Sequence, residues 1–214
     1  MQARDPGSIV PVTSPRVFLL SPARAGGERM GLLLRPNAGF AMAHEFQRNG
    51  AAIGELFQFG SGLYFRGKLA YARRFARPPR KTAGALVIVP GRGLLDVETV
   101  ITADDLRAIA QVPVDARDKR YREPLERDVR ELAGKLGKRG EAVLLGSIAT
   151  GKYADVLLAI LGDRLLFPPS FVGRGDMSRG GLLLRCVRAE MELPYESLRG
   201  AIRHGPRPPK LPRY

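Results

Sequence analysis

Three short apolar runs constrain the fold of this chain more than any other feature. They are VFLLS at 17–21, ALVIVP at 85–90 and AVLLGS at 142–147. Runs of this length, rich in branched side chains and bounded by Pro or Gly, are typical of strands buried on both faces of a sheet. RLLF at 164–167 and GLLLRCV at 181–187 are predicted as two further strands.

Helical patterns fill the gaps between these runs. Apolar residues recur at helical spacing over 125–136 and over 153–161. Thr102, followed by Asp105 three residues later, predicts a capping box that begins a helix extending through Ala110. This order of elements predicts an α/β fold, or a mixed α+β fold, with a mostly buried central sheet and flanking helices.

We expect a single globular domain over 16–198 between two irregular ends. The chain of 214 residues is long enough for one domain with a sizeable core. Residues 1–15 are rich in Pro and predict a flexible arm. Residues 199–214 end in RHGPRPPKLPRY, and this composition predicts a mobile, basic, Pro-rich tail.

The positive charge of the chain predicts a polyanionic partner. Thirty-five Lys and Arg residues oppose 21 Asp and Glu residues, which gives a net charge of +14. Residues 16–81 carry twelve basic and three acidic residues, whereas residues 115–141 carry nine basic and seven acidic residues. The first segment is positively charged along the sequence, so we predict binding to nucleic acid, most simply to duplex DNA without sequence preference.

Several other classes of protein are disfavoured. No apolar run approaches the length of a membrane span, and the first thirty residues lack the order of a signal peptide, so we expect no membrane and a cytoplasmic protein. One cysteine and two histidines provide no cluster with metal-ligand spacing, so neither a metal nor another cofactor is predicted. Cys186 lies in an apolar run and is interpreted as a structural thiol.

The stretch GSIATGKY at 146–153 resembles a phosphate-binding P-loop with one departure. The pattern requires Ser or Thr after the lysine, but Tyr153 follows Lys152 here. A tyrosine oxygen lies at the far end of a ring and cannot hold Mg²⁺ at that position, which disfavours hydrolysis of ATP or GTP. A turn between a strand and a helix can still present backbone N–H groups to a phosphate, so Lys152 is kept as a phosphate-binding candidate.

The stretch LYFRGKLAYARRFAR predicts an amphipathic helix beginning at Leu63. One face would pack against the core, and the other would present cations that could follow phosphates. The alternative is a solvated helix whose aromatic side chains belong to the core. The candidate phosphate-binding residues of this helix are Arg66, Lys68, Arg73 and Arg77.

Glycine-rich turns supply the remaining candidates. FVGRGDMSRGG places Arg174 and Arg179 beside Asp176, which either holds an arginine in place or acts as an acid/base group. Ser147, in the strand-to-helix turn, is the second catalytic candidate. The turns SPARAGG and GRG add the anion-binding candidates Arg24, Gly26, Gly27 and Arg92.

Four segments in order resemble the YaaA-type peroxide-stress proteins. Ser21, Pro22 and Ala23 match their Ser-Pro-Ala, with Arg24 in place of the family lysine. SGLYFRGKLAYA resembles a Tyr-x-Gly-Leu block, and Gly93-Leu-Leu95 matches a Gly-Leu-Leu motif. Ser147 and Tyr153 would flank a longer version of a Ser-x-Glu-Tyr turn.

The resemblance departs from the family inside the motifs themselves. Arg92 stands where the family has Tyr, Asp96-Val97 replaces Arg-Pro, and the Glu of the last turn is missing. The resemblance implies a mixed sheet and binding of double-stranded DNA in oxidative-stress protection.

Two functions of different classes are therefore open. A DNA-binding protein of stress protection or DNA maintenance should have a broad positive face. An enzyme acting on a nucleotide or nucleobase should have a pocket joining the SPARAGG, GRG and GRGDMSRGG turns, with Asp176 or Ser147 inside.

Overall fold

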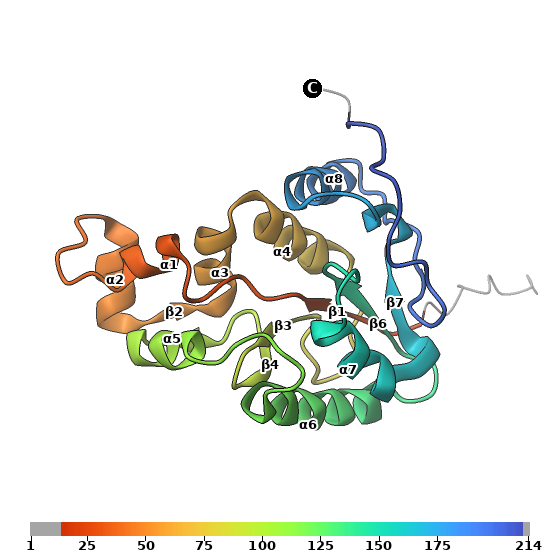
Figure 1. The fold of residues 1–214 in the computed structure, drawn as a ribbon, viewed down its shortest axis with the longest axis horizontal. Coiled ribbons are helices and arrows are strands. Elements are labelled where there is room, and N and C mark those ends of the chain that lie inside the picture. Colours follow the sequence, from red (N-terminus) through yellow and green to blue (C-terminus); the bar gives the residue numbers. More distant parts are fainter. Residues whose placement is uncertain (1–13, 212–214) are drawn as a thin grey trace, which may run out of the picture.

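A six-stranded mixed sheet forms the centre of the computed structural model, which describes residues 14–211 (Figure 1). Its strand order is β4-β3-β1-β6-β7-β8. The three strands predicted with most support are β1 (Arg16–Leu20), β3 (Ala85–Val89) and β6 (Glu141–Leu145). They are parallel and lie side by side, with Phe18 in register with both Ala85 and Val143.

Shorter strands extend the sheet on both sides. β7 (Leu165–Phe167) pairs parallel with β6 and confirms the strand predicted there. β4 (Gly93–Asp96) and β8 (Glu196–Ser197) pair antiparallel at the two edges. Because two antiparallel edges enclose four parallel strands, the chain has an α/β fold with a mixed sheet.

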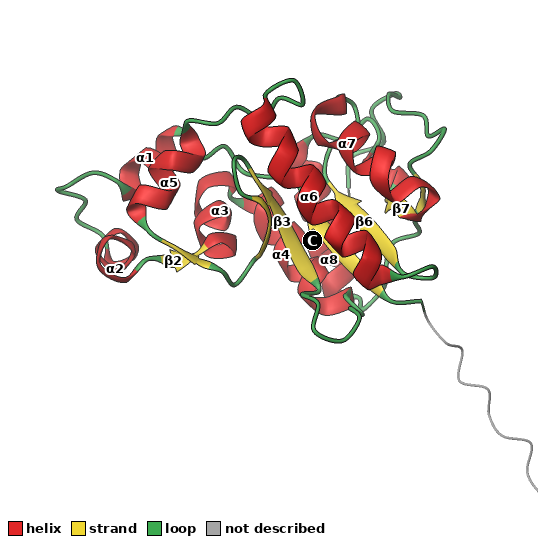
Figure 2. Cartoon of the chain, turned by 90° about the horizontal axis from the view of Figure 1, so that it is seen from below, coloured by secondary structure: helices red, strands yellow, loops and turns green. Residues whose placement is uncertain are grey.

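Helices cover both faces of the sheet. Phe18 and Leu20 of β1 face the layer that contains α4 (Leu63–Phe75) and α8 (Asp176–Arg188). Val17 and Leu19 face α6 (Lys119–Leu136) and α7 (Gly151–Leu161). Figures 1 and 2 show these two layers on opposite sides of the strands. Burial on both faces explains why the central strands read as continuous apolar runs.

A smaller group of helices lies beside the sheet, at the left of Figure 1. It contains α1 (Glu28–Leu33), α2 (Ala41–Asn49), α3 (Ile53–Ser61) and α5 (Ala103–Ala110). A two-stranded sheet of β2 (Ala51–Ala52) and β5 (Val100–Ile101) joins this group together. Its buried side chains belong to the same hydrophobic cluster as α4 and α8, so residues 14–211 form one domain.

The capping box predicted at Thr102 begins a helix in the structure, whereas α6 begins earlier than predicted. Thr102 and Asp105 form a reciprocal capping box at the start of α5. Asp118 caps α6 through a hydrogen bond from the Arg120 N–H, so α6 begins several residues before the predicted apolar stretch. Pro124 therefore lies inside α6.

The strand predicted at 181–187 is wrong, because this stretch is part of helix α8. A short apolar run does not distinguish a strand from a buried helix segment by pattern alone. The preceding glycines weakened the helical signal, but Gly180 is where α8 packs closely against α4. Tertiary packing thus outweighs the low helix propensity of glycine.

The two ends of the chain were predicted to be irregular. The arm predicted for residues 1–15 lies almost wholly outside the described residues. From Leu198 to Leu211 the chain contains no helix or strand, and it returns across α7 and α8. Arg203 pairs with Asp155 at 2.7 Å, and the Pro209 carbonyl accepts a hydrogen bond from Arg174. Among the described residues, no helix combines the length and apolar character that crossing a membrane requires.

Candidate functional site

The candidate site lies at the carboxyl ends of β1 and β6, where hydroxyl, amine and carboxylate side chains line one pocket. These neighbouring strands are parallel, so both carboxyl ends meet at the same edge of the sheet. The chain leaves β1 toward β3 on one side, whereas it leaves β6 toward β7 on the other. The loops after β1 and β6 therefore diverge, and in α/β proteins such a divergence is where ligands usually bind.

A pocket of about 520 Å³ occupies this position. Five parts of the chain line it: the loop after β1, the α3–α4 turn with α4, the α5–α6 loop, the β6–α7 turn with the start of α7, and the start of α8. The lining residues used below are Ser21, Arg24, Tyr64, Lys68, Ser147, Lys152, Tyr153 and Asp176. Its volume lies in the range of sites that hold small ligands.

Lys68 is the least expected residue of the pocket. It is 1% exposed, and its ammonium group has no carboxylate within ion-pair distance among the described residues. Its Nζ atom donates to the carbonyl oxygen of Ser21 at 2.6 Å and lies 2.9 Å from the Ser21 hydroxyl. It also lies over the rings of Tyr64 and Phe65, 4.6 and 4.7 Å from their centres.

This environment disfavours the charged form of Lys68. Burial lowers its pKa from 10.5 to about 7, opposed by the negative charge of Asp176 and assisted by the positive charge of Arg179. The amine is therefore poised between its two protonation states near neutral pH. Lysines with this property are typical of sites that transfer protons or attack ligands.

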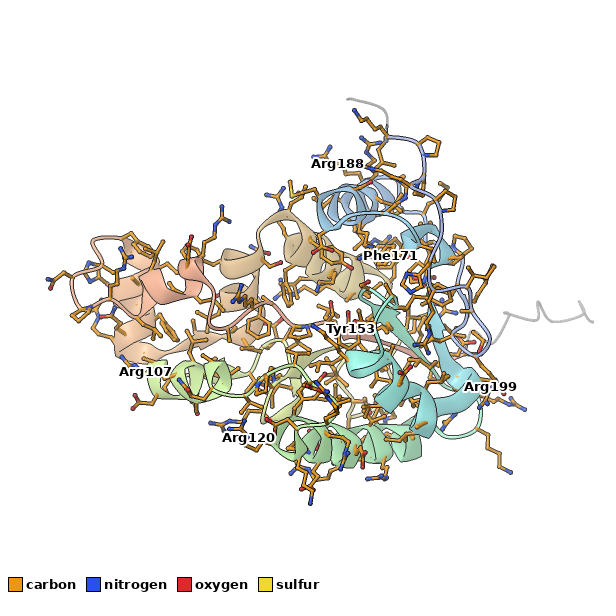
Figure 3. The ribbon with its side chains drawn as sticks, in the orientation of Figure 1. Arg107, Arg120, Tyr153, Phe171, Arg188 and Arg199 are labelled. Atoms are coloured by element: carbon orange, nitrogen blue, oxygen red, sulfur yellow. The ribbon has the colours of Figure 1, made fainter. Side chains whose placement is uncertain are left out.

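Ser21 connects Lys68 to Tyr153. Burial raises the pKa of Tyr153, while hydrogen bonds with the Ser21 side chain and the Ser147 backbone lower it. Gly146, at the end of β6, leaves room for this contact. A Cβ at Gly146 would lie 2.8 Å from Ser21 Cβ and 3.0 Å from the Tyr153 hydroxyl. Figure 3 labels Tyr153 at the start of α7.

The opposite wall is made by Tyr64 and the start of α8. Within residues 14–211 the buried Tyr64 hydroxyl has no partner that meets hydrogen-bond geometry. Burial raises the pKa of this phenol, and the nearby positive charge of Arg179 opposes that rise. Arg179 donates twice to the Phe171 carbonyl at 3.1 Å and pairs with Asp176 at 3.3 Å. Asp176 is exposed on its outer side, so Arg179 fixes one carboxylate at the mouth of the pocket.

Cations surround the mouth. Arg24 and Lys152 are exposed and line the pocket. The backbone turns tightly after Arg24, whose carbonyl accepts from the Gly27 N–H at 3.0 Å. Arg29 reaches the α3–α4 turn, where its Nη1 atom lies 3.3 Å from the position of a Cβ on Gly62.

The pocket brings together five of the sequence-predicted site residues. They are Arg24, Lys68, Ser147, Lys152 and Asp176. Gly26 and Gly27 belong to the same loop as Arg24 but do not line the pocket.

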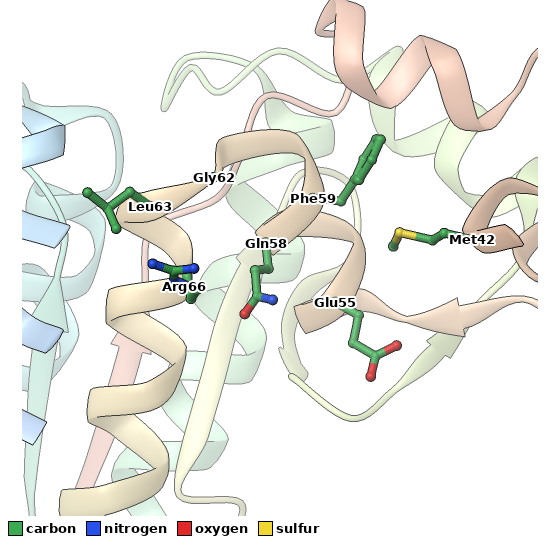
Figure 4. A pocket seen from close by; sticks show the side chains of 7 residues that line it. All are labelled: Met42, Glu55, Gln58, Phe59, Gly62, Leu63 and Arg66. Atoms are coloured by element: carbon green, nitrogen blue, oxygen red, sulfur yellow. The ribbon is translucent and has the colours of Figure 1, made fainter. Parts of the chain in front are cut away.

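The other candidates lie elsewhere. Arg66 lines a separate apolar hollow with Met42, Phe59 and Leu63, shown in Figure 4. Arg92, of the GRG turn, pairs with Asp105, and Arg174 donates to the Ser170 carbonyl. The enzyme hypothesis predicted a pocket of three turns, and the GRG turn is not part of it.

Four of the twelve cations of residues 16–81 form ion pairs with acids distant in sequence. Arg73 pairs with Glu98 and Arg77 pairs with Glu192. Arg16 shares Glu192 with Arg77, and Arg74 pairs with Glu190. The labelled arginines in Figure 3, namely Arg107, Arg120, Arg188 and Arg199, are spread over the outside of the molecule. The surface formed by residues 16–81 is therefore less positive than the count of charges in that segment indicates.

Lys68 was predicted to contact phosphates from an exposed helix face, but its side chain is buried. Residues three or four apart share a helix face, and Lys68 shares its face with Tyr64, Phe65 and Tyr71. This spacing was visible in the sequence and places the lysine on the buried side. Ser21 and Tyr153 were indicated only by the family resemblance.

Among residues 14–211, no three His, Cys, Asp or Glu side chains gather as they would to hold a metal ion. Comparison with protein-family models, with curated proteins and with solved structures gives no match. The resemblance to the YaaA-type proteins therefore stays a prediction, and the functional argument depends on the pocket itself.

Proposed function

We propose that this protein is an enzyme acting on a nucleotide or a similar phosphorylated ligand in the pocket at the ends of β1 and β6. One observation supports this proposal above the others. Two exposed cations, Arg24 and Lys152, border the same pocket that contains the buried amine of Lys68. The rim can hold an anionic group while the interior transfers protons.

The rim suits a phosphate for two reasons. Arg24 can donate two parallel hydrogen bonds to phosphate oxygens. Lys152 lies in the first turn of α7, where unpaired backbone N–H groups and the helix dipole favour a negative charge. These exposed donors line the same pocket as the buried side chains of Ser21, Tyr153 and Lys68.

The proposal can be tested by binding of the four ribonucleoside 5′-monophosphates and the matching nucleosides, measured by calorimetry. We expect at least one monophosphate to bind and its nucleoside to bind more weakly. Arg24→Gln and Lys152→Gln should each weaken monophosphate binding about tenfold, the loss expected for one charge-assisted hydrogen bond.

Arg139→Gln and Lys138→Gln are matched controls, because both residues are exposed and lie outside the pocket. They should leave the affinity unchanged. Absence of binding by every monophosphate, or an equal loss in the controls, would reject this function.

Duplex DNA binding is the second candidate. It is supported by the exposed cations around the α3–α4 turn, since Arg24, Arg29 and Arg66 have no ion pair among the described residues. These cations continue outward from the mouth of the pocket. A nucleic-acid backbone along them would present one nucleotide to the pocket, so the two candidates are compatible.

A further inference from the structure

Building on the proposed function, we propose that Ser21 is a nucleophile and Lys68 its general base, so that the enzyme transfers a phosphoryl group through a covalent intermediate on the Ser21 oxygen. The other groups of the pocket then have defined tasks. Arg24 and Lys152 hold the phosphoryl oxygens, and Tyr153 contacts the Ser21 hydroxyl.

The position of Ser21 suits a nucleophile. It directly follows β1, and its N–H donates to the Leu145 carbonyl at 3.2 Å, so its backbone is fixed to the end of β6. Its hydroxyl lies 2.9 Å from Lys68 Nζ, within reach for direct proton transfer. A Cβ at residue 146 would lie 3.1 Å from this hydroxyl oxygen, so the glycine lets the Ser21 side chain pack directly against the end of β6.

The surroundings of Lys68 suit a base. Its nitrogen is desolvated by two aromatic rings and contacts a carbonyl and a hydroxyl, not a carboxylate that would hold the proton. Its hydrogen bond to the Ser21 carbonyl fixes the amine in place, and its contact with the Ser21 hydroxyl puts a transferable proton within its reach.

The chemical step balances as follows. Ser21 Oγ forms a bond to phosphorus while the bond from phosphorus to the leaving oxygen breaks, and the electron pair stays on that oxygen. The Ser21 proton moves to Lys68 Nζ, and the resulting ammonium returns a proton to the leaving oxygen. Water, or a second alcohol, then attacks the phosphoserine in the reverse sense and restores Ser21.

Phosphorus is favoured over a carbonyl carbon by the charge of the rim. A neutral ester would gain little from Arg24 and Lys152, whereas the phosphoryl oxygens carry negative charge throughout the reaction. The substrate class is thus a phosphoester whose phosphorus can reach Ser21.

A fluorophosphonate probe tests this assignment, because attack by Ser21 forms an oxygen–phosphorus bond and releases fluoride. We expect one probe per molecule, located on Ser21 by peptide mass spectrometry, and none in Ser21→Ala. Lys68→Met should slow labelling about 100-fold, the usual contribution of a general base. Ser197→Ala and Lys135→Met, both outside the pocket, should label at the parent rate.

The pH dependence gives a second readout. The charged or titratable groups facing Lys68 are Asp176 and Arg179 of α8, with the phenols of Tyr64 and Tyr153. The labelling rate should rise through about pH 7 as Lys68 loses its proton. Lys68→Arg keeps the hydrogen-bond donors and provides a folded alternative if Lys68→Met does not fold. It cannot lose its proton, so it should also label slowly.

Parent protein that leaves Ser21 unlabelled, or a folded Lys68 variant that labels at the parent rate, would overturn the inference. Nucleotide affinity separates this failure from failure of the proposed function. If monophosphates still bind but the labelling result is one of these two, only the Ser21–Lys68 assignment is wrong.

Discussion

Gly67 of α4 and Gly180 of α8 lie in direct backbone contact. A Cβ on Gly67 would lie 2.7 Å from the Gly180 carbonyl oxygen, and a Cβ on Gly180 would lie 2.7 Å from the Leu63 carbonyl oxygen. The two helices that cover one face of the sheet and line the pocket thus depend on missing side chains at their crossing. Backbone atoms cannot move aside as the end of a flexible side chain can.

Gly67→Ala should therefore destabilise the protein, although alanine favours a helix by about 1 kcal/mol. Forcing a methyl group into this contact should cost about 1–3 kcal/mol beyond that gain. Gly134→Ala is the matched control, because Gly134 also lies inside a helix and has no atom near its absent Cβ. Urea unfolding should show a lower midpoint for the first variant and a slightly higher one for the second. A rise in both midpoints would contradict the close packing.

The sequence predicted the elements whose pattern is local. β1, β3 and β6 are continuous apolar runs, and Thr102 begins α5 with its capping box as expected. The sequence did not predict α8. Gly180 of that helix is needed for its close contact with α4, and this contact cannot be read from the sequence. A contact between segments more than a hundred residues apart leaves no periodic signal in either one.

The candidate site was predicted in part for the same reason. Arg24, Lys152 and Asp176 were selected from glycine-rich turns, and the parallel strands bring these turns together. The contact between Lys68 and Ser21 could not be predicted, because the sequence does not show that the end of β1 meets α4. The charge count also could not show that arginines of 16–81 pair with Glu98 and Glu192.

The stability of the protein should depend on pH through Lys68. Its folded pKa of about 7 lies below the ordinary 10.5, so between these values the unfolded chain binds the extra proton. Stability contributed by this group should therefore rise with pH across that window, by at most about 1.4 kcal/mol per pH unit, and become constant below it. The free energy of unfolding of the parent, relative to that of Lys68→Met, should increase from pH 7 to pH 9.5.

Lys135→Met controls for the loss of one positive charge, since Lys135 is exposed and pairs with Glu131 on α6. The difference in free energy of unfolding between Lys135→Met and the parent should not change over the same pH range. Parallel curves for the parent and Lys68→Met would show that the buried amine keeps its ordinary proton affinity.

Hydrolysis of ATP or GTP should be absent. GSIATGKY does connect strand β6 to helix α7, as a P-loop would, but Tyr153 occupies the position of the magnesium-binding hydroxyl. The Tyr153 phenol is buried against Gly146 and Ser21. Phosphate release with Mg²⁺ should stay at background and be unchanged by Lys152→Ala. Turnover that this substitution abolishes would instead identify a working P-loop.

Arg179 and Asp176 should differ in their effect on stability. Arg179 is buried and holds the Phe171 carbonyl, so Arg179→Ala should cost about 1–3 kcal/mol by leaving that oxygen without its donor. Asp176→Asn keeps the shape of an exposed side chain and should cost less than about 0.5 kcal/mol. Thermal unfolding of both variants, with Arg117→Ala as an exposed control, checks this order. Equal losses would show that the ion pair, not the carbonyl contact, fixes Arg179.

Duplex DNA should bind with an affinity that falls steeply with salt. Counterion release lowers log affinity by about 0.9 per unit of log salt for each phosphate neutralised. If DNA follows the α3–α4 turn, Arg24→Gln, Arg29→Gln and Arg66→Gln should each reduce the slope by about one contact in an anisotropy titration. Arg117→Gln should not, because Arg117 is paired with Asp115 and lies outside the pocket. Equal changes in all four variants would show a diffuse attraction by the net charge of +14 rather than a binding face. No binding at low salt would remove DNA as a partner.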